Sequence, residues 1–260
     1  MHSKQVDFTR SIDKSQIPTC EILGVKIAAI NMKWLLEFTK KNMKALSGDY
    51  MCVSNVHTTV TAYETPEYME VQNGGVMAIP DGGPLSSIGR KRGFENMERV
   101  TGPSYMEEVL AISEKQGYRH YFYGSTEETL QIMLEKLQKK YPNLVIAGAY
   151  SPPFRTLTEE EDQKIIEAIN ESLPDFVWVG LGAPKQEYWM AAHHGKVKGF
   201  MIGVGAAFDY VAGNIQRAPM WMQKCNLEWL YRLLQDPKRL FKRYVETNTK
   251  FIWHAVIRKK

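Results

Sequence analysis

The chain has 260 residues, 44% of them hydrophobic and 24% charged, and a formal net charge of +4. This composition excludes a mainly disordered chain and fits one medium-sized domain, or a domain with an appendage, that buries a sizeable core. The three cysteines (Cys20, Cys52 and Cys225) are far apart and no Cys or His pair has metal-ligand spacing. The sequence therefore predicts neither a disulfide framework nor a zinc site.

The sequence shows no targeting segment. The first sixteen residues are polar and contain no apolar signal core. No apolar run approaches the length of about 20 residues that a membrane span requires. We therefore expect a cytoplasmic protein, in a reducing compartment, without a spanning helix.

Short apolar runs alternate with helical patterns along most of the chain, which predicts an α/β, Rossmann-like fold: a mostly parallel sheet with helices on both faces. The predicted strands are 21–30 (a strand or a hairpin), 50–55, 75–80, 118–124, 143–150, 175–182 and 198–205. The predicted helices are 31–43, a stretch after 55, 103–117, 125–142, 158–172 and 184–194. The predicted N-caps are Asn31, Ser125 and Thr158, the last in a capping box with Glu161.

From about residue 215 the pattern is helical only. Residues 216–260 hold eleven Lys and Arg against three acids, a local net charge of +8, and three of the six tryptophans. Asp236 and Pro237 predict the start of a helix. We therefore divide the chain into an α/β core (1–214) and a basic, aromatic helical appendage (215–260) that favours an anionic surface or ligand. The tryptophans of the appendage are either core residues or interfacial anchors: Trp221, Trp229 and Trp253.

Ligands of open parallel sheets bind beyond the carboxyl ends of the strands. These strand ends are rich in glycine and polar residues, which suits a nucleotide-sized ligand whose phosphates contact backbone N–H groups at helix starts. The candidate residues at the strand ends are Ser54, Asn55, Asp81, Gly124, Gly182, Gln186 and Asp209.

Several nucleotide-binding motifs are absent. The dinucleotide fingerprint GxGxxG has only its first two glycines in "GLGAPKQ" (180–186), and no Walker motif or Asp-x-Asp pair occurs. The sequence therefore predicts no metal and no cofactor. A departing diphosphate would then need cationic side chains, and the appendage is their densest source.

Asp81 allows two interpretations. The carboxylate stands before two glycines in "IPDGGPL" (79–85), so a substrate could approach it, as general-base catalysis requires. Alternatively, Asp81 caps the turn between Pro80 and Pro84, because Asp is common in turns.

Seven motifs in order resemble the WecG/TagA/CpsF glycosyltransferases (glycosyltransferase family 26), over about residues 20–250. They are "VSNVHT", "IPDGGPL", "ERVTGPS", "FYGS", "VGLGAPKQEYW", "GVGAAFDYVAGNIQRAP" and "LEWLYRLLQDPKRLFKRY". The resemblance implies transfer of a sugar from a UDP-sugar to a membrane-bound polyprenyl-diphosphate-linked saccharide, with inversion. It places the enzyme in the synthesis of bacterial surface polysaccharide, such as capsule or teichoic acid.

The resemblance also implies roles for particular residues. Asp81 matches the proposed catalytic base, and Asn55, Arg99 and Gln186 match active-site positions. This chain departs from the family pattern two residues before Asn55: the family often has Thr there, and this chain has Val53, with Ser54 beside it. The appendage is expected to dock on the inner face of the cell membrane and close over the nucleotide site. Three of its arginines are expected to contact the diphosphate: Arg232, Arg239 and Arg243.

Each residue has a structural alternative. Arg99 could pair with Glu95 or Glu98, Asn55 could only cap a helix, and Gln186 could be an ordinary first-turn residue. Asp209 could cap a turn, and the appendage arginines could form a solvated basic face. His193 and His194 lie at a predicted helix end, where the helix dipole favours histidine, and we assign them no metal.

Two other classes of function compete with glycosyl transfer. One is a Rossmann-type oxidoreductase or epimerase, which the missing third glycine disfavours. The other is a non-enzymatic membrane or nucleic-acid binder, but no nucleic-acid module is visible, so we expect no nucleic-acid partner. The sequence does not decide which sugar is transferred (N-acetylmannosamine, its uronate or a hexose), nor the linkage, the polymer or the oligomeric state, and a homo-oligomer stays open.

Overall fold

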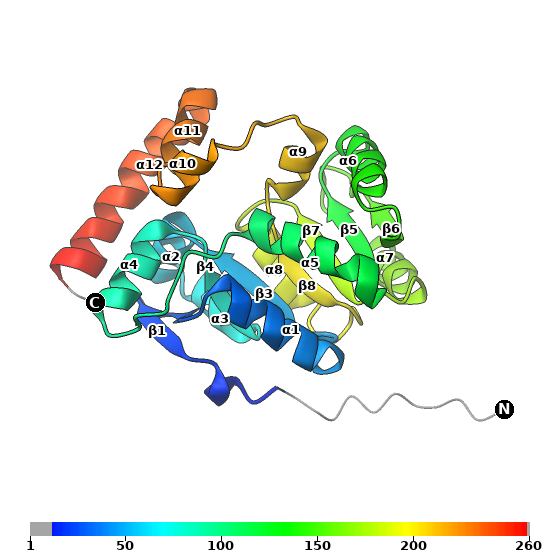
Figure 1. Cartoon of the computed structure of the whole chain (residues 1–260), viewed down its shortest axis with the longest axis horizontal. Helices are drawn as coiled ribbons and strands as arrows, with labels where there is room; N and C mark the ends of the chain where they lie inside the picture. Colours follow the sequence, from blue (N-terminus) through cyan, green and yellow to red (C-terminus); the bar gives the residue numbers. More distant parts are fainter. Residues whose placement is uncertain (1–11, 259–260) are drawn as a thin grey trace.

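The computed structural model describes residues 12–258 and shows an eight-stranded sheet with helices on both faces (Figure 1). β1 and β2 form an antiparallel hairpin, and the other neighbouring strands are parallel. The predicted α/β fold is therefore confirmed. In sheet order the strands are β1 (Thr19–Ile22), β2 (Val25–Ala28), β4 (Met77–Pro80), β3 (Tyr50–Ser54), β8 (Phe200–Gly203), β7 (Phe176–Gly180), β5 (Arg119–Gly124) and β6 (Val145–Tyr150).

The helices cover the two faces of the sheet in two groups. One face is covered by α1 (Met32–Leu46), α5 (Gly102–Gln116), α6 (Glu127–Lys140) and α9 (Ala207–Ala212). The other is covered by α2 (Val56–Glu64), α3 (Pro66–Gly74), α7 (Glu159–Glu171) and α8 (Lys185–Ala192). The helix α4 (Gly83–Lys91) follows β4 and packs on this second group. A short 3₁₀ helix, η1 (Lys14–Gln16), precedes β1.

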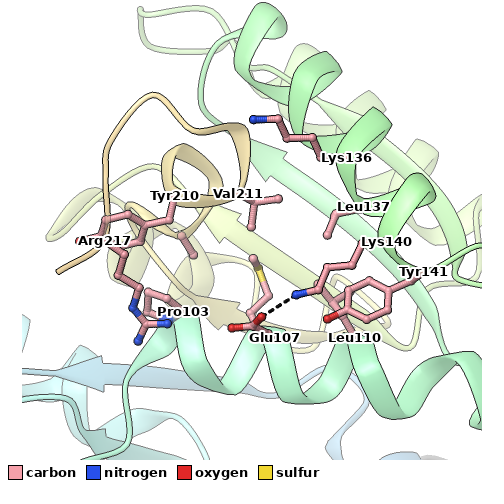
Figure 2. A pocket seen from close by; sticks show the side chains of 12 residues that line it. Pro103, Glu107, Leu110, Lys136, Leu137, Lys140, Tyr141, Tyr210, Val211 and Arg217 are labelled. Carbon is pink, nitrogen blue, oxygen red and sulfur yellow. Dashed lines mark hydrogen bonds and ion pairs between the residues drawn. The ribbon is translucent and has the colours of Figure 1, made fainter. Parts of the chain in front are cut away.

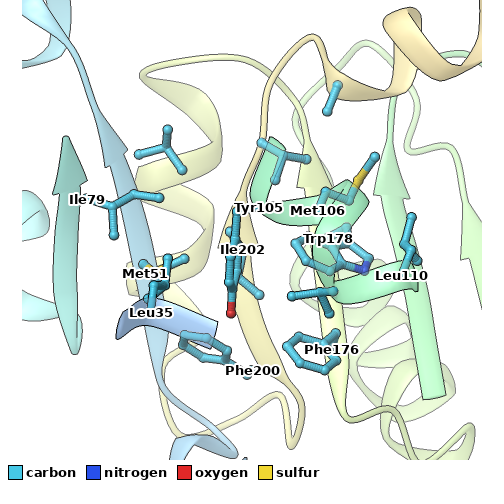
Figure 3. Packing of buried hydrophobic residues seen from close by; sticks show 14 of the residues in the cluster. Leu35, Met51, Ile79, Tyr105, Met106, Leu110, Phe176, Trp178, Phe200 and Ile202 are labelled. Carbon is cyan, nitrogen blue, oxygen red and sulfur yellow. The ribbon is translucent and has the colours of Figure 1, made fainter. Parts of the chain in front are cut away.

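The core between the sheet and α5 combines aromatic and aliphatic side chains (Figure 3). Trp178 of β7 is fully buried and stacks on Phe176, with ring centroids 5.5 Å apart. Its indole Nε1 donates a hydrogen bond to Nδ1 of His120 at 3.0 Å. Tyr105 of α5 packs edge-on against Trp178, with ring centroids 6.0 Å apart. Strands that are apolar on both faces are typical of a parallel sheet, as the sequence predicted.

One predicted helix start is wrong. Ser125 has a φ of 60°, so its backbone cannot enter the helix as an N-cap, and the cap of α6 is Thr126, whose hydroxyl accepts from the N–H of Thr129 at 3.2 Å. The other predicted caps are confirmed at Asn31 and Thr158, the latter in a complete capping box. A two-residue turn with positive φ at both residues joins β1 to β2. Of the two alternatives for residues 21–30, a strand or a hairpin, the hairpin is therefore confirmed.

The appendage consists of α10 (Met220–Lys224), α11 (Glu228–Gln235), α12 (Pro237–Phe251) and the π-helical η2 (Ile252–Ile257). Figure 1 shows these helices, in orange to red, beside α2 and α4. α12 packs against α2, where Lys250 pairs with Glu64 at 2.7 Å and His254 contacts the ring of Tyr63. Asp236 caps α12, as predicted.

The appendage exposes much of its apolar surface. Trp221, Trp229 and Trp253 are 62%, 45% and 46% exposed, so of the two alternatives the one in which they are core residues is wrong. Leu240 and Phe251, by contrast, are buried against the rest of the molecule. No helix in residues 12–258 is long and apolar enough to cross a bilayer.

Candidate active site

A cleft of about 910 Å³ lies at the carboxyl ends of the parallel strands. The loops that follow β3, β4, β5, β7 and β8 line it, together with side chains of α11 and α12. This is the edge at which open α/β sheets bind their ligands, and the volume suits a ligand of nucleotide size. The cleft therefore brings the core and the appendage together around one space.

Asp81 lines the cleft directly after β4. Its N–H donates to the carbonyl oxygen of Ser54 at 2.8 Å, which ties the end of β4 to the end of β3. Its side chain is 23% exposed, and α4 begins after Gly82 without a side-chain cap, so the geometry does not support the turn-capping interpretation. Burial raises the pKa of the Asp81 carboxyl, an effect that Arg99 opposes and Glu228 strengthens.

Arg99 lies between α4 and α5 and contacts Asp81 at two points. Its Nε donates to the carbonyl oxygen of Asp81 at 2.7 Å, and its Nη2 is 3.4 Å from the carboxylate Oδ1. The same Nη2 donates to Oε2 of Glu228, in the appendage, at 2.7 Å. The alternative in which Arg99 pairs with Glu95 or Glu98 is wrong, because its partners are the acids of the cleft.

Two predicted site residues at the end of β3, Ser54 and Asn55, lie on different sides of the strand end. Asn55 lines the cleft and caps α2, its Oδ1 accepting from the N–H of His57 at 2.9 Å. The cap uses the side-chain oxygen, so the amide nitrogen of Asn55 can still serve a ligand. Ser54 was predicted to bind substrate, but it does not line the cleft. It is fully buried, and its hydroxyl donates to Oε1 of Gln72 at 2.5 Å. Side chains alternate along a strand, so Val53 lines the cleft while Ser54 points to α3.

Gln186 holds two loops of the cleft together. Its Oε1 accepts from the N–H of Gly182 at 3.2 Å and from the N–H of Gly205 at 3.0 Å. Its Nε2 donates to Oε1 of Glu187 at 2.8 Å. Gln186 is a first-turn residue of α8, as the structural alternative held, but it is buried and it lines the cleft beside Gly182. Its bonds fix the loops after β7 and β8 relative to each other.

Two further predicted residues differ in position. Gly124 was predicted to bind substrate, but it does not line the cleft. Its φ is 120°, and a Cβ there would lie 2.7 Å from the backbone of Gly180, so glycine lets β5 and β7 approach closely. The adjacent Ser125 lines the cleft instead. Asp209 lines it from α9, and its carboxylate also accepts from Nδ2 of Asn214 at 3.3 Å.

The three predicted arginines of the appendage all line the cleft. The guanidinium of Arg232 lies over the ring of Tyr210, 5.9 Å from its centroid. Arg239 pairs with Asp236 at 2.5 Å, and Nε of Arg243 is buried without a hydrogen-bond partner in the described chain. With the core arginine they give the cleft four guanidinium groups, which suits a diphosphate. Among residues 12–258, no three His, Cys, Asp or Glu side chains are grouped to hold a metal ion.

A second cavity, of about 340 Å³, lies between α5, α6 and α9 (Figure 2). Tyr210 lines both cavities. Lys140 pairs with Glu107 at 2.6 Å, and Lys136 donates to the carbonyl oxygen of Ala212 at 2.5 Å. Because the protein engages both lysines, and Arg217, which also lines this cavity, donates to Ser104, the cavity suits an anion less well than the cleft does.

Comparison with known proteins identifies the family of this chain. The model of the glycosyl transferase WecG/TagA/CpsF family matches residues 20–260. The chain belongs to this family. It is therefore a glycosyltransferase, as the motifs predicted.

Two relatives carry the name N-acetylglucosaminyldiphosphoundecaprenol N-acetyl-beta-D-mannosaminyltransferase. The relative from Staphylococcus aureus (strain MW2) is 28% identical over 231 residues, which are 88% of this chain and 89% of the relative. The relative from Bacillus subtilis (strain 168) is 32% identical over 196 residues, which are 74% and 73% of the two chains.

The side chains that line the cleft and were not predicted from the sequence include Tyr210 and Glu228, and Arg217 lies beside Glu228. Arg217 donates to the hydroxyl of Ser104 at 2.7 Å, and its Nε is 3.5 Å from Oε1 of Glu228. The available signal was that Glu228 is one of only three acids in a strongly basic segment. The helix dipole also favours an acid in the first turn of a helix, so the presence of Glu228 at the start of α11 could be explained without a role in the site.

Proposed function

We propose that this glycosyltransferase moves a sugar from a UDP-sugar to a polyprenyl-diphosphate-linked saccharide, with inversion and with Asp81 as general base. The observation that carries the proposal is that Asp81, Arg99 and the arginines of the appendage line one cleft. The names of the two relatives describe transfer of N-acetylmannosamine to an N-acetylglucosaminyl diphosphoundecaprenol. N-acetylmannosamine is therefore the first donor sugar to test, with its uronate and hexoses after it.

The first chemical task is to activate the acceptor. A sugar hydroxyl is a poor nucleophile, and removing its proton as the bond to the anomeric carbon forms accelerates transfer about 10²- to 10⁴-fold. The raised pKa of Asp81 makes it a stronger base than an ordinary aspartate. Its backbone is held by Ser54 and by Nε of Arg99, so the carboxylate has a fixed place in the cleft.

The second task is to stabilise the leaving group. When the bond between the anomeric carbon and the diphosphate oxygen breaks, its electron pair stays on UDP and adds negative charge there. Fixed guanidinium groups favour that charge more in the transition state than in the ground state. Arg99 supplies one such group from the core, and the appendage supplies the others, from α11 and α12.

The shape of the cleft supports a lipid-linked acceptor. The cleft extends between α4 and the end of α12, where Ile88, Ile252 and Val256 line it. This part is apolar and gives the first isoprene units a path away from Asp81. Outside the cleft, the appendage exposes apolar residues such as Phe241 beside many basic ones. We propose that this surface docks on the anionic inner face of the cell membrane as a peripheral contact.

The substitution Asp81→Asn tests the proposal. It keeps the shape of the side chain but removes its basicity, so transfer should fall about 10²- to 10⁴-fold. UDP binding, measured by isothermal titration, should be nearly unchanged, and it serves as the control for folding. Transfer is measured with UDP-N-acetylmannosamine and other UDP-sugars on a synthetic polyprenyl-diphosphate acceptor. Normal turnover by the variant would reject Asp81 as the base.

A further inference from the structure

A buried acid of the appendage reaches into a cleft that is otherwise rich in arginine. Glu228, the first residue of α11, is 6% exposed. Its Oε2 accepts from Nη2 of Arg99 at 2.7 Å, and its Oε1 is 3.5 Å from Nε of Arg217. A carboxylate here opposes the binding of an anionic substrate and loses hydration. Its position therefore calls for a role beyond surface solubility.

The role follows from how Arg99 divides its hydrogen bonds. Its Nε is used by the carbonyl oxygen of Asp81, so Nη2 is the nitrogen that two carboxylates share. Glu228 takes the short bond, at 2.7 Å, and Asp81 is left with a contact of 3.4 Å. A full ion pair with Arg99 would favour the ionised form of Asp81 and make it a weaker base. Glu228 prevents that pairing.

We propose that Glu228 is a positioning residue that holds the guanidinium of Arg99 away from the carboxylate of Asp81. Because Glu228 is the first residue of α11, the appendage supplies this contact to the core. The proposal rests on the proposed function, since it assigns a purpose to the proposed base.

The charges around Asp81 agree with this geometry. Burial is the largest cause that raises the pKa of Asp81; Glu228 raises it further, while Arg99, Arg232 and Arg217 lower it. Burial also raises the pKa of Tyr210, on α9, to about 12, so this phenol is neutral over the working range. The other ionisable side chains that line the cleft are His57, Lys91, Asp209, Arg239, Arg243 and Tyr244.

The test is the pH dependence of kcat/KM for Glu228→Gln. Glutamine keeps the shape and a hydrogen-bond acceptor for Arg99 but removes the charge. The acid limb of the profile should move to lower pH by about half a unit or more. The rate on the plateau should fall about tenfold, because Asp81 has become a weaker base. A role confined to folding or docking would lower the rate without moving the limb.

The matched control is Glu246→Gln, on α12. Glu246 belongs to the same appendage, but its side chain is 55% exposed and pairs with Lys250 at 3.3 Å, outside the cleft. This variant removes the same charge and should keep the wild-type profile. Flotation with anionic vesicles shows whether both variants bind membranes equally well. Glu228→Ala, which also removes the acceptor for Arg99, should lower the rate more than Glu228→Gln does.

The outcomes distinguish a failure of the role proposed for Glu228 from a failure of the proposed function on which it rests. If Glu228→Gln has a wild-type acid limb while Asp81→Asn is inactive, only the role of Glu228 is overturned. An equal shift of the limb in Glu246→Gln would also overturn it, because the effect would then come from net charge alone. If Asp81→Asn turns over normally, the proposed base itself is rejected.

Discussion

At the residue scale, His120 shows how burial fixes a protonation state. Its ring is fully buried beside Phe176 and Trp178, and Nδ1 must be unprotonated to accept the hydrogen bond from Trp178. Burial lowers the pKa of His120 from 6.5 to about 3. Between these values the unfolded chain binds a proton that the folded chain excludes. Stability is therefore complete above about pH 6.5 and is lost as the pH falls.

We expect His120→Asn to flatten this dependence. At about pH 5 the single histidine should contribute a loss of about 2 kcal/mol relative to pH 7.5 in the wild type, and the variant should lack that loss. Urea titrations at the two pH values measure it as a difference in the free energy of unfolding. His194→Asn, at a ring that is 47% exposed, is the control and should keep most of the wild-type slope. Equal slopes in wild type and His120→Asn would contradict the assignment.

The place of a residue in the cleft could be predicted where neighbouring residues determine it, and could not be predicted where a contact with a distant segment determines it. Asp81 and Asn55 could be identified because they end strands, and strand ends meet at one edge of a parallel sheet. Ser54 ends a strand too, but the alternation of side chains turns it to the other face. Glu228 could not be found, because its partner Arg99 is 129 residues away and no spacing rule joins them.

At the element scale, the strands were predictable because apolar runs bounded by turn residues form buried parallel strands. Helix starts followed from their caps at Asn31, Thr158 and Asp236, where a side-chain oxygen meets an unpaired backbone N–H. The cap failed at Ser125, since its left-handed backbone depends on the close approach of β5 to β7 rather than on local sequence. The wall that α12 gives the cleft was expected only from the family resemblance, because an amphipathic pattern by itself does not say what covers the apolar face.

The end of α12 and η2 gives a prediction about the acceptor. Ile252 and Ile257 belong to the same element and are similarly exposed, at 51% and 59%, but only Ile252 lines the cleft. Ile252→Ser should raise KM for a long-chain polyprenyl acceptor about fivefold or more, since it removes apolar contact area. With an acceptor that carries only a short alkyl chain, KM should stay near the wild-type value. Ile257→Ser is the matched control, and an equal change in both variants would argue for membrane contact instead of a lipid path.

At the scale of the whole molecule, the appendage combines two charged surfaces on one helix. Arg239 and Arg243 of α12 line the cleft, whereas Lys238 and Lys242 are exposed and do not. The predicted boundary after residue 214 falls in the loop between α9 and α10, and the division into two domains stays a prediction. Net charge alone predicts an anionic partner for the whole segment. The fold places the arginines that the resemblance named in the lining of the cleft and leaves these two lysines outside it.

Two double variants with the same loss of charge test this separation. Lys238→Gln with Lys242→Gln should weaken binding to anionic vesicles about tenfold or more, because each lysine near a membrane contributes about 1 kcal/mol. Its turnover on a short-chain acceptor in detergent should stay normal. Arg239→Gln with Arg243→Gln should lower that turnover about 100-fold and weaken UDP binding, because the departing diphosphate loses fixed donors. Flotation measures vesicle binding, isothermal titration measures UDP binding, and initial rates measure turnover. Equal losses of turnover in the two double variants would show that the arginines act as general surface charge rather than at the reaction.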